Sequence, residues 1–175
     1  MYVDKLLASR WISSPPGLTI DWNYKDKYVD ISIPGYVEKA LHRFQHKSPK
    51  KPQYAPHKWN IPIYGQKTQY VIPTHDEPIL DPKKTKYVQA VGGTFLYYAR
   101  AIDCTMLPAL NEIASVQSKP TAKTLQKVDM LLDYAATYPD AKIRFYASDM
   151  ILHVSSDAAY LVLPGARSRI AGYIF

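Results

Sequence analysis

The chain has 175 residues and a net charge of +7, and 47% of its residues are hydrophobic. That hydrophobic fraction excludes wholesale disorder, and the length suffices for one domain or two small ones. The single cysteine, Cys104, excludes a disulfide framework and favours an intracellular, reducing setting. No apolar run approaches 18 residues, so we expect no membrane span. The basic excess favours a polyanionic partner without distinguishing nucleic acid from an acidic protein or membrane surface.

Two alternating runs in the first part of the chain predict a β-hairpin. Residues 18–24 and 28–33 each alternate apolar and polar side chains, and the polar residues 25–27 lie between them. A helix is expected over 35–46, because Pro34 and Gly35 open it and apolar residues then recur at helical spacing. The apolar stripe comprises Val37, Ala40, Leu41 and Phe44, and the opposite face carries Lys39, His42, Arg43 and His46.

The stretch 47–84 has no sustained periodicity and is rich in proline. Two short runs, 59–64 and 69–72, are expected at most as edge strands, because proline excludes a central position in a sheet. A loop of this length is unusual inside a compact domain. We therefore expect an extended connection that packs on a partner or wraps it.

Three helices with short connections are expected next, over 85–100, over 105–118, and between Thr121 as N-cap and Pro139. The adjacent glycines 92–93 lie inside the first helix, at a cost of roughly 1 kcal/mol each relative to alanine, which indicates close packing against another backbone. The inward positions are Val88, Val91, Phe95, Leu96, Ala99, Met106, Leu110, Ile113, Ala114, Leu125, Val128, Leu132 and Ala135.

Beyond residue 140 the period of the pattern changes to two. Strands are expected over 143–146, 150–154, 159–163 and 170–175, with a turn at 164–167 before the last of them. A sheet that stops at an apolar phenylalanine would leave an unpaired hydrophobic edge, which natural domains avoid. We therefore expect the chain to be a piece of a larger protein.

Three blocks, taken together and in this order, resemble the reverse transcriptase–RNase H region of retrotransposon polyproteins, closest to the copia type. The first block is 17–44, similar to the end of the polymerase palm with its primer-grip hairpin and first thumb helix. The second is 91–100 with the two helices that follow. The third combines Ser156-Asp157-Ala158 with 172–175, and it resembles the opening hairpin of RNase H. The resemblance covers roughly residues 17–175.

The resemblance implies an α+β fold with a hairpin and thumb-like helix, an extended Pro-rich connection, a three-helix unit, and the opening antiparallel strands of an incomplete RNase H-like sheet. The corresponding segments are 1–46 for the palm end and first thumb helix, 47–84 for the connection, 85–139 for the helical unit and 140–175 for the RNase H-like start. Residues 1–16 do not match the expected palm sequence, and the polymerase's paired aspartates are absent.

Asp157 is the one catalytic residue that the resemblance indicates, as a single ligand in an incomplete RNase H-like metal site. The parent enzyme uses Mg²⁺, and two-metal hydrolysis needs several converging carboxylates, so we expect this chain to bind Mg²⁺ weakly and to be inactive alone. From its position alone, Asp157 is equally a strand-end or turn aspartate. His42 and His46 have metal-pair spacing, but no glutamate of an H-E-x-x-H motif lies between them.

Nucleic-acid binding is expected from the hairpin, from the polar face of the first helix and from the basic residues that follow it. Cross-strand packing of the hairpin aromatics and a merely solvated helix face are the alternative interpretations. Lysines at the hairpin tip would contact phosphates and position a duplex without reading its sequence. The expected binding residues are Trp22, Tyr24, Lys25, Lys27, Lys39, Arg43, Lys47, Lys50 and Lys51.

The expected partners are a template–primer duplex of RNA–DNA or DNA and the remainder of the polyprotein, with no membrane. The expected location is cytoplasmic, within virus-like particles in the parent element. The alternative is a non-catalytic nucleic-acid-binding or scaffold protein derived from the same region. A decayed reading frame without selected function is a third possibility.

Overall fold

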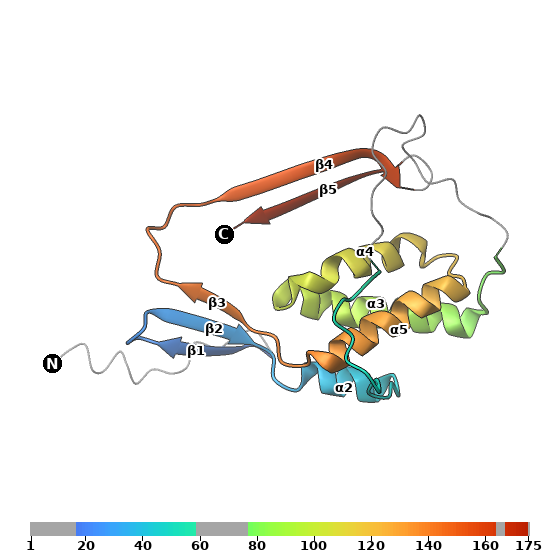
Figure 1. Cartoon of the computed structure of the whole chain (residues 1–175), viewed down its shortest axis with the longest axis horizontal. Helices are drawn as coiled ribbons and strands as arrows, with labels where there is room; N and C mark the ends of the chain where they lie inside the picture. The colour runs from blue at the N-terminus through green and yellow to red at the C-terminus, as the bar shows by residue number, and fades with distance from the viewer. Residues whose placement is uncertain (1–16, 59–76, 164–166, 175) are drawn as a thin grey trace. The chain divides into compact units, whose positions relative to one another are not determined.

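The computed structural model describes residues 17–58, 77–163 and 167–174. The chain divides into two compact units, and the described parts of the first are 17–57 and 80–147. The second unit holds the remaining described residues, chiefly 148–174. Small antiparallel sheets and helices make an α+β protein, as the sequence predicts (Figure 1).

The expected hairpin is present in the first unit. Strands β1 (Thr19–Asn23) and β2 (Tyr28–Ser32) pair antiparallel, and their register places Asn23 opposite Tyr28 beside the turn. The Asn23 side chain stabilises the turn both as an acceptor and as a donor. Its Oδ1 accepts from the Asp26 backbone N–H at 2.9 Å, and its Nδ2 donates to the Asp26 carboxylate at 2.9 Å. Asn-type side chains stabilise turns through such local bonds.

A third strand joins the hairpin from far along the chain. Strand β3 (Ile143–Tyr146) pairs antiparallel with β2, so the sheet order is β1-β2-β3. The sequence pattern groups this strand with those after it, in the segment 140–175. In the structure it belongs to the first unit instead. Alternation identifies a strand but not its partner, because every half-buried strand has the same period.

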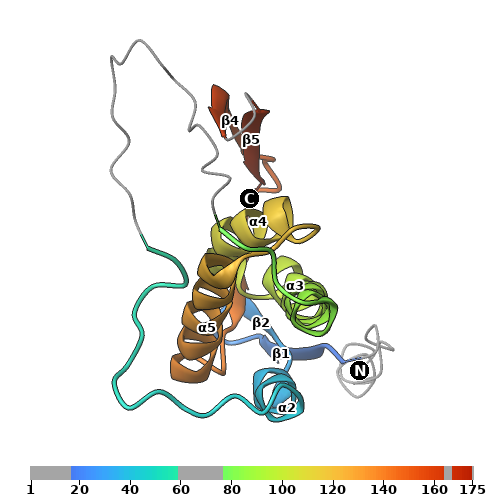
Figure 2. The ribbon, with the colours of Figure 1, turned by 90° about the vertical axis from the view of Figure 1, so that its right-hand side faces the viewer.

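Five helical elements complete the first unit, and Figure 2 shows its α-helices from the side. Thr121 caps its helix as expected, but the first helix ends at Arg43 and not at residue 46, and the helix expected over 105–118 is a short 3-10 turn followed by a helix that ends at Val116. Helix α3 begins three residues before the expected Thr85, because Asp81 caps it: its carboxylate accepts from the Lys84 N–H at 2.8 Å, with a proline in the first turn. Thr121 and Thr124 form a capping box at α5. The elements are α2 (Tyr36–Arg43), α3 (Pro82–Ala101), η1 (Cys104–Met106), α4 (Leu107–Val116) and α5 (Ala122–Thr137).

The core lies among these helices, and all buried hydrophobic residues of the described chain belong to the first unit. Two predicted inward positions, Leu96 and Ala114, are exposed instead. Tyr98 is fully buried, which the pattern does not predict. Its hydroxyl satisfies two backbone groups, donating to the Pro139 carbonyl at 3.3 Å and accepting from the Ala141 N–H at 3.2 Å. Those bonds make the burial of a polar aromatic favourable.

The close backbone packing expected at Gly92 and Gly93 is absent from the described structure. A Cβ added at either position meets nothing within 4 Å. These glycines therefore leave open space beside α3, and their lack of a side chain is not explained by a neighbouring backbone.

The second unit contains one long hairpin. Strand β4 (Val154–Leu163) pairs antiparallel with β5 (Arg167–Ile174), with an irregularity between Ala159 and Leu163. The two expected strands 150–154 and 159–163 are thus wrong in their bounds. Asp157 lies within β4, opposite Ala171, and not after a strand. Ser155, Ser156 and Asp157 are all exposed there, so their polarity does not interrupt the strand.

Several expectations fall on parts of the chain outside the described residues. They are the N-terminal stretch 1–16, the edge strands 59–64 and 69–72, and most of the turn at 164–167. Arg167, the last residue of that expected turn, is the first residue of β5.

Candidate nucleic-acid interface

One face of the three-stranded sheet is apolar along its whole length, but the core covers only part of it. Ile20, Ile31 and Ile143 lie in one row across the strands and are half-buried, and Ile31 packs against the core. The next row lies two residues nearer the hairpin turn, and there Trp22 and Phe145 are 56% and 51% exposed. The sheet extends beyond the helices at this end (Figure 1).

Two aromatic rings stack on that exposed face. Trp22 and Tyr24 have ring centroids 6.1 Å apart and an interplanar angle of 14°, and Tyr24 is 68% exposed. These two rings come from the same strand end, so their stacking is not cross-strand, whereas Tyr28 packs across the strands against Tyr146 as the alternative interpretation expects. Lys25 and Lys27 follow in the turn and are exposed. Four predicted binding residues therefore gather at one end of the sheet.

The opposite face of the same sheet carries an ion pair that sequence reasoning missed. Arg144 donates to both carboxylate oxygens of Asp30, at 2.7 and 2.8 Å, and its guanidinium lies 3.8 Å from the centroid of the Tyr28 ring. The Arg144 bonds hold the pKa of the Asp30 carboxyl below its usual value. Arg144 is therefore engaged within the fold. The pair depends on the β2–β3 register, which a single sequence does not reveal.

The predicted polar face of α2 is split by the structure. Lys39 and Arg43 are exposed, and the Arg43 guanidinium lies 5.4 Å from the centroid of the Phe44 ring. His46 points inward, where its Nε2 lies 2.8 Å from an Asp133 carboxylate oxygen on α5. Its side chain is only 14% exposed. His42 is therefore exposed on α2 while His46 is bonded to α5, and the two do not form a metal pair.

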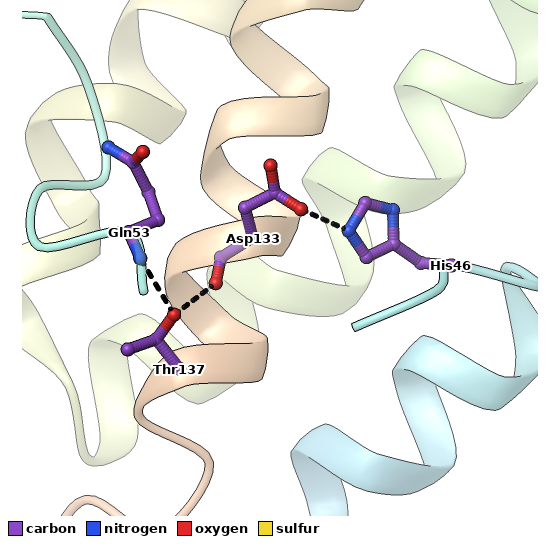
Figure 3. A network of polar contacts seen from close by, with 4 residues as sticks. All are labelled: His46, Gln53, Asp133 and Thr137. Atoms are coloured by element: carbon purple, nitrogen blue, oxygen red, sulfur yellow. Dashed lines mark hydrogen bonds and ion pairs between the residues drawn. The ribbon is translucent and has the colours of Figure 1, made fainter. Parts of the chain in front are cut away.

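The basic segment after α2 is held against α5 at both ends (Figure 3). His46 bonds to Asp133 at one end. At the other, the Gln53 N–H donates to the Thr137 hydroxyl at 3.0 Å, and that hydroxyl donates to the Asp133 carbonyl at 2.8 Å. We call residues 47–52 between these two anchors the lysine loop. It carries the predicted binding residues Lys47, Lys50 and Lys51, all exposed.

The two groups of predicted binding residues lie at opposite ends of β2. The turn with its lysines precedes β2, and α2 with the lysine loop follows it (Figure 1). A five-residue strand is about 17 Å long. Duplex nucleic acid carries one negative charge per roughly 1.7 Å of its axis, so an elongated polyanion has charge enough to reach both groups. A small anion does not.

Asp157 belongs to the second unit. It is exposed, and its carboxylate accepts from the Ala158 N–H at 2.8 Å. Throughout the described ranges, no three His, Cys, Asp or Glu side chains gather as metal ligands would. One carboxylate does not meet the oxygen-rich octahedral coordination of Mg²⁺, so the described residues alone do not fit the ion.

The first unit also has a shallow cavity of about 410 Å³ at the end of α5. Carboxylates of Asp103 and Asp140 line it together with the rings of Tyr134 and Tyr138. Asp103 is already engaged, since it accepts from the N–H and hydroxyl of Thr105. The acidic lining makes this hollow unsuited to phosphate, so it adds nothing to the basic surface described above.

In the described part of the chain, no helix is long and apolar enough to cross a membrane. Comparison of the chain with protein-family models, with curated proteins and with solved structures finds no significant match.

Proposed function

We propose that this chain binds the template–primer duplex of a retrotransposon reverse transcriptase, as a piece of the polyprotein that also carries RNase H. The observation that carries the proposal is the arrangement around β2. Exposed aromatics and lysines precede the strand, and an anchored lysine loop follows it. Phosphate contacts from such positions set the register of a duplex without reading its bases.

The anchoring of the lysine loop supports a binding role. Ordering a lysine-rich segment on binding costs conformational entropy, and a segment that is already held loses less. Both anchors of the loop lie on α5, near Asp133 and Thr137. The lysines between them are exposed to a partner, while the two ends of their loop are bonded to α5.

In this proposal β4 and β5 are the opening strands of an RNase H-like sheet, and Asp157 is one carboxylate of its metal site. Phosphodiester hydrolysis by two metals would need further carboxylates from elsewhere in the polyprotein. We expect neither primer extension nor RNA cleavage from the chain alone. Magnesium-dependent extension of a labelled primer by the purified chain would contradict this part of the proposal.

The binding test is a salt titration with a labelled RNA–DNA hybrid and a double-stranded DNA of the same length. Affinity should fall linearly on a log–log plot against salt, because bound lysines release counterions. Replacing Lys47, Lys50 and Lys51 by glutamine should reduce the slope by up to about 3. The matched control replaces three exposed lysines outside the predicted binding set, Lys83 and Lys86 on α3 and Lys119 after α4, and should leave the slope nearly unchanged.

A non-catalytic binding or scaffold protein derived from this region is the second candidate. The observation in its favour is that the first unit holds every buried hydrophobic residue of the described chain, as a self-standing module would. Equal affinity for hybrid and DNA duplex would favour this candidate. Indifference to both at low salt would contradict the proposed duplex binding.

A further inference from the structure

We infer that the exposed aromatic face of the sheet, formed by Trp22, Tyr24 and Phe145, stacks on an unpaired base of a nucleic acid next to its duplex. We call these three residues the aromatic face. The inference rests on the proposed duplex binding and deepens it, because it adds a β3 residue and a class of substrate. The preferred ligand becomes a duplex with a single-stranded overhang.

The aromatic face is where the apolar side of the sheet continues past the core. Trp22, Val29 and Phe145 are directly opposite one another across the three strands, so they share one face. Val29 is half-buried between two exposed rings. Tyr24 extends the row toward the turn by stacking on Trp22. The three rings therefore lie on one face of the sheet, with Trp22 and Tyr24 stacked and Phe145 across Val29.

The residue types on this surface indicate which class of partner it binds. Every base has a π-face, and bases stack on exposed aromatic rings with little dependence on sequence. Lys25 and Lys27 follow Tyr24 in the exposed turn and would contact phosphates next to a stacked base. A strand of nucleic acid presents both bases for the rings and phosphates for the lysines, whereas an apolar protein partner offers no counter-charge to the lysines.

The fold makes this surface dependent on β3. Phe145 lies in the same row as Trp22, one strand beyond Val29, only because β3 pairs with β2. The Asp30–Arg144 ion pair joins β2 and β3 on the opposite face. The two faces have separate roles, since one holds the strands together and the other stays exposed. Tyr146 follows Phe145, is also exposed, and lies on the ion-pair face against Tyr28.

The test compares three labelled ligands with the full chain. One is a blunt RNA–DNA hybrid, the second carries a short single-stranded DNA overhang, and the third carries an overhang of abasic nucleotides with the same phosphates. The natural overhang should bind about tenfold more tightly than the abasic one, from stacking of one base. Trp22→Ala and Phe145→Ala should each remove most of that difference, and Tyr146→Ala should preserve it.

A more direct measurement uses the fluorescence of Trp22. The chain has three tryptophans, so Trp11→Phe with Trp59→Phe leaves Trp22 as the only indole. Its fluorescence should be quenched by the natural overhang and not by the abasic one. Circular dichroism melts of each variant establish that it is folded, and Tyr24→Ala replaces any variant that is not.

Three results would overturn the inference. If the blunt hybrid binds but natural and abasic overhangs bind equally, the stacking is wrong and the duplex binding stands. If no ligand binds at low salt, the proposed function fails first. If sedimentation shows a dimer that Trp22→Ala dissociates, the aromatic face serves contact between copies of the chain.

Discussion

Arg144 and Asp30 join the last strand of the first unit to the hairpin through two parallel N–H···O bonds of 2.7 and 2.8 Å. Paired donors of this kind fix orientation as well as distance, because the guanidinium and the carboxylate must be coplanar. Asp30 is only 6% exposed, while the Arg144 side chain is 42% exposed. The carboxylate therefore depends on this partner more than the arginine does.

Removing the partner should destabilise the first unit. Arg144→Met leaves the Asp30 carboxylate poorly solvated and unpaired, which lowers the melting temperature measured by circular dichroism. Asp21 lies directly opposite Asp30 on β1 and is exposed. Asp21→Asn removes a like charge beside Asp30, so it should leave the melting temperature unchanged or slightly higher. Equal destabilisation by both changes would contradict the assigned role of Arg144.

The same carboxylate makes stability depend on pH in the acid range. The Arg144 bonds depress the pKa of Asp30 in the folded state. Its contribution is therefore fully present above the unfolded pKa of about 4, and it is lost as pH falls through the lower folded pKa. Urea titrations at neutral pH and near pH 3 should show that acid lowers the unfolding free energy less for Asp30→Asn than for the unchanged chain. If the unfolding free energies of the two proteins change in parallel with pH, the assigned contribution of Asp30 is contradicted.

The anchor at His46 should matter for both stability and binding. His46→Ala removes a mostly buried contact with Asp133 and should cost about 1–2 kcal/mol of unfolding free energy. His42→Ala, four positions earlier and exposed on α2, should stay within about 0.5 kcal/mol. If the lysine loop acts through its anchoring, His46→Ala should also weaken hybrid binding at low salt, and His42→Ala should weaken it less.

Gly93 offers a stabilising substitution. It is exposed inside α3, and an added Cβ meets nothing within 4 Å. Gly93→Ala should therefore raise the unfolding free energy by up to about 1 kcal/mol, because alanine loses less backbone entropy in a helix. Gly35→Ala is the contrasting variant, since φ of +71° there places it in the left-handed region. It should lower stability in the same urea titration.

Tyr98 should prove more important than its neighbour Tyr97. Tyr98→Phe keeps the buried ring but leaves the Ala141 N–H and the Pro139 carbonyl without the hydroxyl. We expect a loss of about 1–2 kcal/mol, whereas Tyr97→Phe at an exposed site should be nearly neutral. Thermal melts of the two variants provide the comparison.

Local features of the fold were predictable because the residues that cause them are neighbours in sequence. The turn after Asn23 and the cap at Thr121 each involve residues within three positions of one another, as does the cap at Asp81, although the sequence pattern predicted that helix to start at Thr85. Such chemistry is visible in any short window of sequence. Even there, the pattern continued a helix stripe through Leu96, which the structure leaves exposed.

Long-range relationships of the candidate site were not predictable. Asp30 and Arg144 are 114 positions apart, and His46 and Asp133 are 87 apart. A single sequence contains no information on which strand pairs with which, so the lysines were identified but not the anchors that hold their loop. At Asp157 the difficulty is different, because there the resemblance suggested a role for a single residue. Its resemblance to a metal ligand depends on residues that the described structure does not place beside it.

The pairing of β3 with β2 also has a consequence for synthesis on the ribosome. The hairpin emerges early, yet its third strand follows 114 positions later, at the Asp30–Arg144 pair. At about 5–20 residues per second, the ribosome needs roughly 6–23 s to supply it. During that interval β2 has an open edge, which favours pairing with other chains. Nascent chains that stall before residue 143 should therefore depend on chaperones more than chains stalled after 147.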